Sequence, residues 1–338
     1  MIKIDIAIPI FNEEDSIRDC LNSVLNFDNP EKHDIKIFVI DGGSNDKSLE
    51  LVKYYTDNYD NIALIHNKKK IAASALNLAI DRGDGEYLMR LDAGNIFQKD
   101  YLTKCIETSI RNNADNVGGF LEIKAKTDSF SSSLTQILMS HPFAVGNSTF
   151  RTTSDLKECS VDTVPYGFFK KNIFKKIGNF NEKLERAQDY EFNSRILSSG
   201  GKIILNPQIK GIYYSMNLWS HLKKIFFVDA PYNAYMWKLN PNSFSIRHSI
   251  TLFFVLGIFG GIILSPLNFY INIIFLSVIG LYFLIALFSS ISSVFKTSNV
   301  FLLFILPVCF FTYHFLHGLG ILIGVIKILF KKSPLDNK

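Results

Sequence analysis

The sequence predicts an α/β domain with a doubly wound, mostly parallel sheet, followed by an all-α hydrophobic membrane tail. Two observations on the 338-residue chain support this fold class. Up to about residue 240, charged residues mix with apolar ones, and short β-branched runs alternate with amphipathic segments. Between Ile250 and Phe330, only Lys296 and Lys327 are charged. The two parts of the chain are therefore expected to lie in different solvents.

Short apolar runs and amphipathic segments alternate through the first hundred residues. The first run, KIDIAIPI, is rich in β-branched residues, and IKIFVI is continuously apolar, as in a parallel strand covered on both faces. The predicted strands lie at 3–10, 35–40, 62–66 and 86–91. The predicted helices lie at 17–25, from about 47 to 55, and at 71–80. Strands that alternate with helices in this way are typical of a parallel, doubly wound sheet.

Polar residues follow three of these strands at the point where each strand ends. Asn12 and Glu13 follow the first strand, Asp41 the second and Asp92 the fourth. Ligands of such sheets bind outside the carboxyl ends of the strands, so these side chains are expected to share one edge. Carboxylates there suit Mg²⁺ or Mn²⁺ bound with a diphosphate. No glycine-rich phosphate loop follows the first strand, which disfavours a dinucleotide site and a P-loop.

The second half of this domain is less regular. We expect a loop at 140–151, a strand and a glycine turn within 161–171, a short helix at 172–177, and a strand at 203–205. A further helix is expected to end near Leu197, with Asp189 at or near its first turn. Asp189 is then either a helix-capping residue or a general base on a rigid element. Phe168 and Phe169 are expected either in the core or beside a bound acceptor substrate.

The tail contains three apolar stretches, at about 250–264, 270–289 and 300–330, preceded by a juxtamembrane amphipathic linker at 216–248. About 20 apolar residues are needed to cross a bilayer, so the first stretch is short and the third is too long for one straight crossing. The third stretch could be a kinked helix or a hairpin. Three simple crossings would separate Lys331 and Lys332 from Arg247, against the positive-inside rule. A third segment that returns, or that lies in the interface, would remove this conflict.

Composition excludes several other classes of protein. The net charge is +5, and no basic run is interleaved with aromatic residues, so no nucleic-acid partner is expected. Lysines near the tail fit anionic lipid headgroups. The four cysteines are far apart and lack any metal-ligand spacing. The N-terminus, MIKIDIAIPI, has no signal-peptide features, so the first domain is expected in the cytoplasm.

Four segments, taken in order, resemble the motifs of inverting family 2 glycosyltransferases of the GT-A fold. They are IAIPIFNEE, VIDGGSNDKS, YLMRLDAGN and AQDYEFNSR. The segments SHPFAVGNSTFR and VDTVPYGFFKK are similar to those of the subgroup that contains the succinoglycan-type membrane-associated glucosyltransferases. The resemblance covers residues 4–330, and its strength lies in the ordered set, because each motif alone is weak.

The resemblance implies a division of labour along the chain. Residues 1–240 would form a cytosolic GT-A domain, with a nucleotide-binding half at about 1–98 and an acceptor half at about 99–215, and residues 249–330 would form the membrane region. Asp189 would be the catalytic base, and Asp92 would bind Mg²⁺ or Mn²⁺ with Asn95 and water. The residues implied to bind the nucleotide sugar are Pro9, Phe11, Asn12, Glu13, Asp41, Ala72, Asn77, Arg90, Asp92 and Ala93. Those implied to contact the acceptor or a lipid diphosphate are Gln188, Glu191, Arg195, His221, Lys223 and Lys224.

Two departures from the family pattern stand out. Gly94 occupies the place where many members carry a second acid, and the segment LWSHLKKIFFVD lacks the Gln and Arg that often precede the membrane segment. Lys223, Lys224 or His221 would have to replace those contacts.

The function implied is transfer of a sugar from a nucleotide sugar, with UDP as the expected nucleotide, to a saccharide on a polyprenyl diphosphate. The enzyme is then expected to be a multi-pass protein of the cell membrane, with its catalytic domain on the cytoplasmic side. Three alternatives stay open: a non-catalytic sugar-nucleotide or lipid-binding scaffold, a processive polysaccharide synthase, and a membrane-bound nucleotidylyltransferase.

Overall fold

The computed structural model describes residues 1–146, 148–153, 155 and 157–332. Within it the chain forms two compact units. The first unit combines Met1–Lys124 with Thr149–Tyr214, and the second combines Ala125–Ser148 with Ser215–Lys338. The segment 125–148 thus leaves the α/β unit and joins the apolar helices, although it lies far from them in the sequence.

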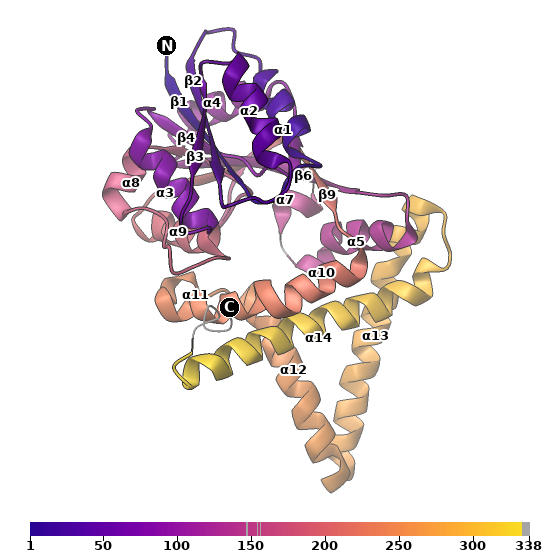
Figure 1. The fold of residues 1–338 in the computed structure, drawn as a ribbon. Coiled ribbons are helices and arrows are strands. Elements are labelled where there is room, and N and C mark those ends of the chain that lie inside the picture. Colours follow the sequence, from indigo (N-terminus) through magenta and orange to yellow (C-terminus); the bar gives the residue numbers. More distant parts are fainter. Residues whose placement is uncertain (147, 154, 156, 333–338) are drawn as a thin grey trace. The chain divides into compact units, whose positions relative to one another are not determined.

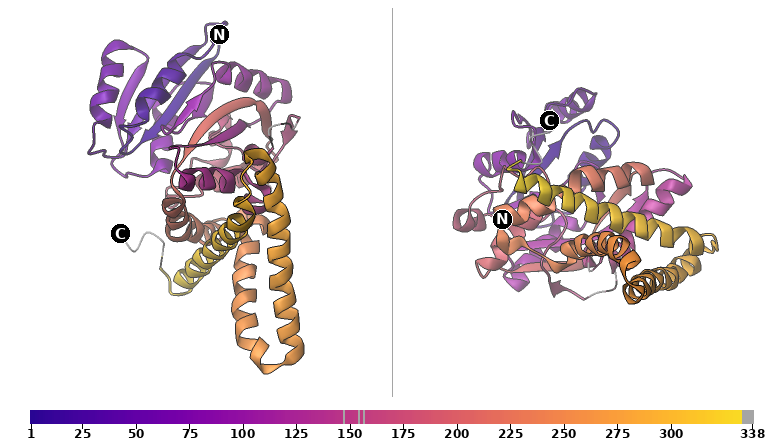
Figure 2. Two further views of the ribbon diagram at one scale, coloured as in Figure 1. Left: turned by 90° about the vertical axis from the view of Figure 1, so that its right-hand side faces the viewer. Right: turned by 90° about the horizontal axis from the view of Figure 1, so that it is seen from below.

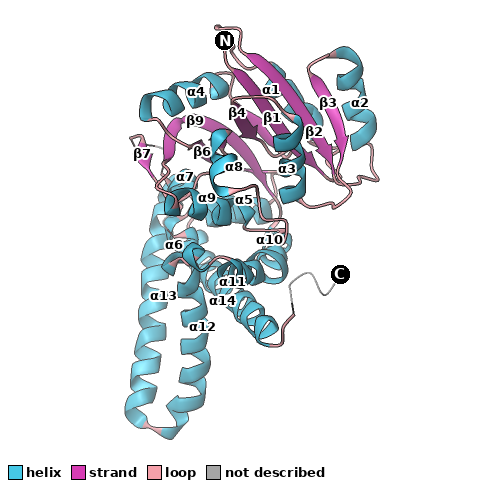
Figure 3. Cartoon of the chain, turned by 90° about the vertical axis from the view of Figure 1, so that its left-hand side faces the viewer, coloured by secondary structure: helices cyan, strands magenta, loops and turns pink. Residues whose placement is uncertain are grey.

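The first unit is built on one sheet, in the order β3-β2-β1-β4-β8-β6-β9-β5, with β7 paired to β9 (Figures 1 and 3). Its strands are β1 (Lys3–Ile10), β2 (Asp34–Asp41), β3 (Ile62–His66), β4 (Tyr87–Arg90), β5 (Asn95–Phe97), β6 (Asn116–Ala125), β7 (Cys159–Ser160), β8 (Phe168–Lys170) and β9 (Ile203–Ser215). Strands β1 to β4 pair in parallel. β8 is antiparallel to both β4 and β6, so β6 runs in the direction of β4. The predicted fold class, a doubly wound and mostly parallel sheet followed by apolar helices, is confirmed.

Helices cover both faces of the parallel strands. The helices of this unit are α1 (Ile17–Leu25), α2 (Ser48–Asn58), α3 (Ala72–Arg82), α4 (Tyr101–Asn112), α7 (Thr149–Thr152), α8 (Asn172–Ile177) and α9 (Gln188–Ser198). The chain moves outward from β1 to β3 and then returns to β4 on the other side of β1, so right-handed crossovers place α3 opposite α1 and α2 (Figure 1). The carboxyl ends of β1 and β2 are level, since Ile10 pairs with Asp41. The loops that follow them therefore lie side by side.

Four phenylalanines join β8, α8 and α9 into one aromatic cluster. The ring centroids of Phe180 and Phe192 lie 4.4 Å apart and stacked, and Phe169 meets Phe192 edge-on at 5.5 Å. Phe174 stacks on Phe192 at 5.0 Å. Phe168 is also buried, against Tyr87 at 4.6 Å. Of the two roles expected for Phe168 and Phe169, the structure shows core packing.

The prediction of a loop at 140–151 is wrong. α5 (Phe130–Ser140) ends there, and two short helices follow, α6 (Pro142–Val145) and α7 (Thr149–Thr152). Pro142 stands in the first turn of α6, where proline is favoured, and the His141 side chain accepts a hydrogen bond from the Phe143 N–H. These residues support the start of α6, and both α6 and α7 are too short to show a hydrophobic period. The strand expected at 203–205 also continues much further, to Ser215.

The second unit is all-helical. Besides α5 and α6 it contains α10 (Leu218–Lys224), the π-helical turn η1 (Ile225–Asp229), α11 (Ala230–Leu239), the 3-10 turns η2 (Pro241–Ser243) and η3 (Ser265–Leu267), α12 (Ile246–Leu264), α13 (Phe269–Thr297) and α14 (Leu302–Leu329). Among the described residues, three stretches are long and apolar enough to cross a membrane: His248–Leu267, Phe269–Thr297 and Leu302–Leu329. The first is longer than the sequence suggested, and the third is one helix that continues through Pro307.

We predict that Phe192→Ala destabilises the first unit by about 3–5 kcal/mol, because it removes the ring at the centre of the aromatic cluster and leaves a cavity. Leu197→Ala is the matched control, since Leu197 lies on the same helix and is 41% exposed. Its cost should stay within about 0.5 kcal/mol. Urea unfolding of the full chain in detergent, followed by circular dichroism, measures both. Equal costs would contradict the assigned core.

Candidate active site

The loops after β1 and β2 are tied together by Asn12. The Asn12 N–H donates to Ser44 Oγ (3.0 Å), and Asn12 Oδ1 accepts from the Asn45 N–H (2.9 Å). The backbone of Asn12 has φ 55°, a left-handed conformation that asparagine tolerates better than most residues. The side chain of its neighbour Phe11 is 56% exposed. Asn12 therefore shapes this edge, and Phe11 offers a free ring face beside it.

Asp41 ends β2 and organises the turn that follows. Its carboxylate accepts hydrogen bonds from the N–H groups of Gly43 and Ser44, both at 2.9 Å. His66 Nδ1 lies 3.6 Å from Asp41 Oδ2. Burial acts to raise the pKa of Asp41, but the hydrogen bonds from Ser44 and Gly43 and the nearby His66 outweigh it. The pKa of Asp41 therefore lies below its ordinary value, and the carboxylate is ionised.

Glu13 lies beside the position where the second acid of the family pattern is missing. Its N–H donates to Ser48 Oγ (2.7 Å), and its Oε2 accepts from the Ser16 hydroxyl (2.5 Å). A Cβ atom added to Gly94 would lie 4.0 Å from Glu13 Oε2. An acid at residue 94 would thus stand next to an existing carboxylate. Glu13, in the loop after β1, therefore adds a carboxylate beside the loop that follows β4.

A buried arginine links the two acids to which the sequence assigned the chemistry. Arg90 Nε and Nη2 donate to the two Asp92 carboxylate oxygens at 3.1 and 3.3 Å. Arg90 Nη1 lies 3.9 Å from Asp189 Oδ2. Burial disfavours the charged guanidinium, but the carboxylates of Asp92 and Asp189 outweigh this effect and raise the pKa of Arg90. The structure thus brings Asp189, at the start of α9, to the carboxyl end of β4.

Four buried polar atoms around this triad make no hydrogen bond to any part of the chain that the structure describes. They include donors as well as acceptors: Arg90 Nη1, Asn95 Oδ1, Tyr166 OH and Gln188 Oε1. Buried polar groups in proteins are nearly always paired, so these exceptions need an explanation, and a ligand bound at this edge would provide one. Asn95 also donates to the Asp92 carbonyl at 2.9 Å, which holds its amide beside that residue.

Tyr166 is a site residue that the sequence did not reveal. It lies in the segment VPYGFF with φ 61°, directly before Gly167, and its hydroxyl is buried. Burial, followed by the negative charge of Asp92, raises the pKa of Tyr166 well above its ordinary value, so it stays a neutral hydrogen-bond donor. Its burial and its positive φ before a glycine mark the position as special, and neither can be read from the sequence.

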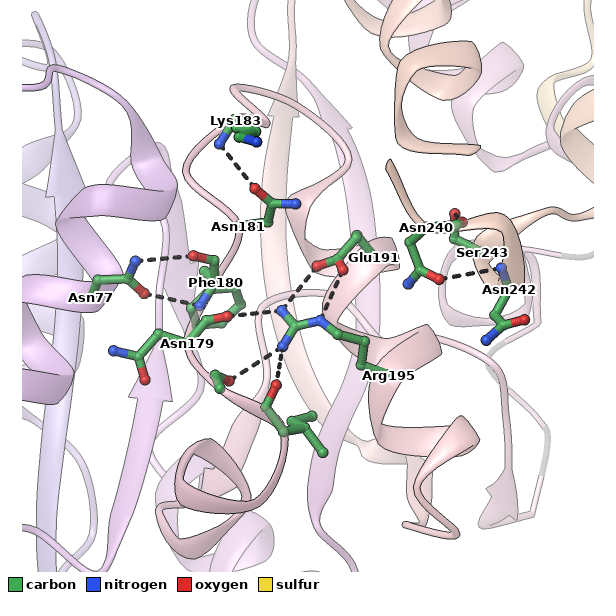
Figure 4. Close-up of polar contacts among 12 residues, drawn as sticks. Asn77, Asn179, Phe180, Asn181, Lys183, Glu191, Arg195, Asn240, Asn242 and Ser243 are labelled. Atoms are coloured by element: carbon green, nitrogen blue, oxygen red, sulfur yellow. Dashed lines mark hydrogen bonds and ion pairs between the residues drawn. The ribbon is translucent and has the colours of Figure 1, made fainter. Parts of the chain in front are cut away.

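Asn77 connects α3 to the loop that leads into α9 (Figure 4). Its Oδ1 accepts from the Phe180 N–H and its Nδ2 donates to the Phe180 carbonyl, both at 3.0 Å. Nδ2 also lies 2.9 Å from Glu182 Oε1, and Lys69 pairs with the other oxygen of Glu182. The Asn77 amide is thus engaged within the protein.

Arg195 and Glu191 hold the same loop from α9 (Figure 4). The guanidinium forms two hydrogen bonds to the Glu191 carboxylate, at 2.8 and 2.9 Å. It also donates to the carbonyls of Ile177 and Asn179, at 2.7 and 2.8 Å. The arginine fork suits this bidentate and multiple bonding. These contacts fix the start of α9, and with it Asp189, against α8.

The remaining predicted residues are placed as follows. Pro9 is half-buried near the end of β1, Ala72 opens α3, and Ala93 is buried directly after Asp92. His221, Lys223 and Lys224 belong to α10 in the second unit. There, Lys223 Nζ lies 5.2 Å from the centre of the Trp219 ring, and His221 stacks on Tyr313 at 6.1 Å.

The model of the family described as "Glycosyl transferase family 2" matches residues 5–178. The chain belongs to this family. The match contains β1, β2 and β4, at whose carboxyl ends Asn12, Asp41 and Asp92 lie, and it confirms the resemblance drawn from the ordered motifs. The molecule is thus a family 2 glycosyltransferase.

Relatives of this family 2 glycosyltransferase come from archaea and bacteria. The dolichyl N-acetyl-alpha-D-glucosaminyl phosphate 3-beta-D-2,3-diacetamido-2,3-dideoxy-beta-D-glucuronosyltransferase of Methanococcus voltae is 28% identical, over 96% of this chain and 97% of its own length. Succinoglycan biosynthesis protein ExoA of Rhizobium meliloti is 23% identical over 62% of each chain. Among solved structures, S. aureus TarS 1-349 is 18% identical, covering 70% of this chain and 65% of its own, with a TM-score of 0.46.

Tyr166→Phe should stabilise the glycosyltransferase and weaken it as an enzyme. Removing a buried hydroxyl that makes no hydrogen bond relieves about 1 kcal/mol of desolvation cost. Losing a donor in the site should lower kcat/KM by about fivefold or more, the equivalent of ~1 kcal/mol. Urea unfolding and initial-rate kinetics measure the two effects. Tyr54→Phe, at a 64% exposed position, is the control and should change neither. A loss of stability in Tyr166→Phe would contradict the assignment.

Asp41→Asn tests the ionised carboxylate through the pH dependence of stability. Because the folded pKa is below the ordinary value of 3.8, Asp41 stabilises the fold above about pH 4, and this contribution is lost as the pH falls through the folded pKa. The difference in free energy of unfolding between wild type and Asp41→Asn should be largest above about pH 4 and shrink in more acidic solution. Urea unfolding at a series of pH values measures it. A difference that grows toward acid would overturn the assignment.

Proposed function

We propose that this enzyme transfers a sugar from a UDP-sugar to a hydroxyl of a saccharide carried on a membrane lipid, with inversion at the anomeric carbon. The observation that carries the proposal is Arg90, which joins Asp92 at the end of β4 to Asp189 at the start of α9. A donor diphosphate near Asp92 and an acceptor hydroxyl near Asp189 would then meet in one place. The buried, unpaired atoms of Asn95, Tyr166 and Gln188 would add hydrogen-bonding capacity there.

Asp189 acts in this proposal as the general base. Its carboxylate is 30% exposed and stands in the first turn of a rigid helix. It takes the proton of the acceptor hydroxyl while the hydroxyl oxygen forms a bond to the anomeric carbon. On the opposite face, the bond between that carbon and the diphosphate oxygen breaks, and the nucleoside diphosphate leaves with the electron pair. One displacement inverts the anomeric centre.

Residues of the first two loops would hold the nucleoside. Phe11 presents an exposed ring on which a base can stack, and Asp41 and Glu13 supply carboxylate acceptors at the same edge. Arg90 contributes positive charge close to the place proposed for the diphosphate. These roles use the polar and aromatic groups that follow β1, β2 and β4.

We further propose Mg²⁺ or Mn²⁺ as the cofactor. Within the described residues no group of three or more His, Cys, Asp or Glu side chains could hold a metal ion. The chain offers instead the half-exposed Asp92 carboxylate and the unpaired Asn95 Oδ1. This set fits Mg²⁺, which is commonly bound by one or two carboxylates, substrate phosphates and water. Bound there, the ion would neutralise charge on the leaving diphosphate.

The proposed acceptor rests on two observations. The Methanococcus voltae relative, similar over nearly the whole chain, is named for action on a dolichyl-phosphate-linked sugar. The second unit carries three helices long and apolar enough to cross a membrane. An enzyme anchored in the membrane meets a lipid-borne acceptor at a high effective concentration. The anchor would be multi-pass, with the catalytic unit on the cytoplasmic side.

Membranes that contain the enzyme should transfer label from one of a panel of radiolabelled UDP-sugars to lipid-linked acceptors, offered as monophosphates and diphosphates. Asp189→Asn should lower kcat by roughly 10²–10⁴-fold, as expected on loss of a general base. Asp57→Asn, at an exposed position on α2, is the matched control and should keep full activity. EDTA should abolish transfer and Mn²⁺ should restore it. The Asp92→Asn variant should need a higher Mn²⁺ concentration than the wild type for the same rate of transfer.

Each outcome addresses one assignment. Full activity in Asp189→Asn would refute the base, and transfer that withstands EDTA would refute the metal. Binding of UDP-sugar without turnover on any acceptor would favour a non-catalytic scaffold. A product that lengthens by many sugars in one encounter would favour a processive synthase.

A further inference from the structure

Helix α14 crosses the other two long apolar helices instead of running beside them. α12 and α13 are joined by η3 and lie side by side as a hairpin, while α14 lies across it (Figures 1 and 2). The crossing is marked by Thr251 on α12 and Tyr282 on α13, which contact His317 and His314 of α14 at 2.7 and 2.8 Å. At 1.5 Å per residue, the hairpin continues about 20 Å beyond this level to its tip at η3.

Glycines bring the C-terminal half of α14 into close contact with its neighbours. A Cβ atom added to Gly318 would lie 2.0 Å from the Thr251 carbonyl oxygen. Cβ atoms added to Gly320 and Gly324 would lie 2.7 Å from the carbonyl oxygens of Phe226 in η1 and Pro231 in α11. Backbones this close leave no room for side chains between them. This half of α14 is therefore firmly seated on α12, η1 and α11.

The N-terminal half of α14 packs on the segment inserted from the first unit's sequence. Leu302, Leu306 and Phe310 form a buried cluster with Leu134 and Leu138 of α5. α5 has the sequence FSSSLTQILMS, in which hydroxyl and amide side chains are frequent. Several of these polar groups are used in hydrogen bonds. The Ser131 hydroxyl accepts from the Leu218 N–H, and the Ser215 hydroxyl donates to the Ser132 carbonyl. Both halves of α14 thus pack on helices that carry polar side chains: α5 on the N-terminal half, and α11 on the C-terminal half.

The face of α14 turned away from α5 and α11 is apolar. It is exposed at both ends of the helix, and in its middle Phe311 and Phe315 are half-buried against Phe283 and Phe259 of the hairpin. At about 100° per residue, Phe304, Val308, Ile326 and Leu329 fall within a single arc, roughly opposite the buried Leu306, Phe310 and Ile321. His314 and His317 point to the buried side, where they bond to Tyr282, Ala144, Thr251 and Asn233. An apolar stripe of this length beside a largely exposed apolar hairpin fits a lipid surface.

We infer that α14 does not cross the membrane: it lies in the plane of the bilayer interface, and only the α12–α13 hairpin enters the membrane deeply. A crossing α14 would carry α5 or α11, which are packed on its two halves, to the far side with their polar groups. With α14 in the plane, Lys296, Lys327, Lys331 and Lys332 all remain on the side where the hairpin begins. This distribution satisfies the positive-inside rule. The inference rests on the proposed membrane attachment but not on the proposed reaction.

Depth measurements at the two exposed ends of α14 and at Phe315, its half-buried middle position, test the placement. Single cysteines at Phe304, Phe315 and Ile326, in a chain whose native cysteines are replaced by serine, would carry a nitroxide label in vesicles of mixed neutral and anionic phospholipid. Accessibility to oxygen and to a water-soluble nickel complex reports depth. An in-plane helix gives the same depth at all three positions. A crossing helix places Phe315 deepest and the other two near opposite surfaces, which would overturn the inference.

Side-specific labelling provides the second test. In sealed vesicles of one orientation, a membrane-impermeant maleimide should label Lys332→Cys from the same side as Asn242→Cys, which stands just before the hairpin. Labelling from opposite sides would show a crossing α14. If all three labelled positions were freely accessible to the nickel complex, the membrane attachment itself would fail, separately from the placement of α14. Retained glycosyltransferase activity in each variant is the control for folding.

Discussion

A buried positive charge held between two carboxylates sets the geometry of the catalytic unit. The Arg90 side chain is only 9% exposed, and an uncompensated charge in such a place costs several kcal/mol. Asp92 and Asp189 supply the compensation from two elements that are far apart in the sequence. The aromatic cluster around Phe192 and the Arg195 network then hold α9 in position. Much of the second half of this unit thus serves to present one carboxylate to the end of β4.

The parallel half of the sheet could be predicted because each strand and helix carries its own local pattern. The strand ends delivered Asn12, Asp41 and Asp92 to one edge, since the carboxyl ends of parallel strands share that edge. The start of α9 was also predictable from its polar first turn and apolar stripe. The place of Asp189 at the same edge was expected only from the family resemblance, because no local pattern reports the return of the chain through β8 and α8.

What escaped prediction depends on contacts across long stretches of chain. The Asn77 amide is matched to the backbone of a residue 103 positions away, and the partners of Arg195 include three main-chain carbonyls, which have no sequence signature. Tyr166 became visible only through its burial and its backbone conformation. The helices α6 and α7 were missed because each has only four residues, too few to show a hydrophobic period, and α6 begins at a single capping residue, His141.

The seating of α14 also changes what the hydrophobic tail is. Leu134, Leu138 and Ala144 belong to a segment that interrupts the catalytic unit, yet their buried neighbours are Ala286, Leu302, Leu306 and Phe310. Shortening the protein at Tyr214 to obtain a water-soluble enzyme would strip this segment of its cover and leave an apolar surface in the middle of the chain. The tail is therefore a structural partner of the catalytic sequence, and a soluble version would need 125–148 redesigned together with the cut.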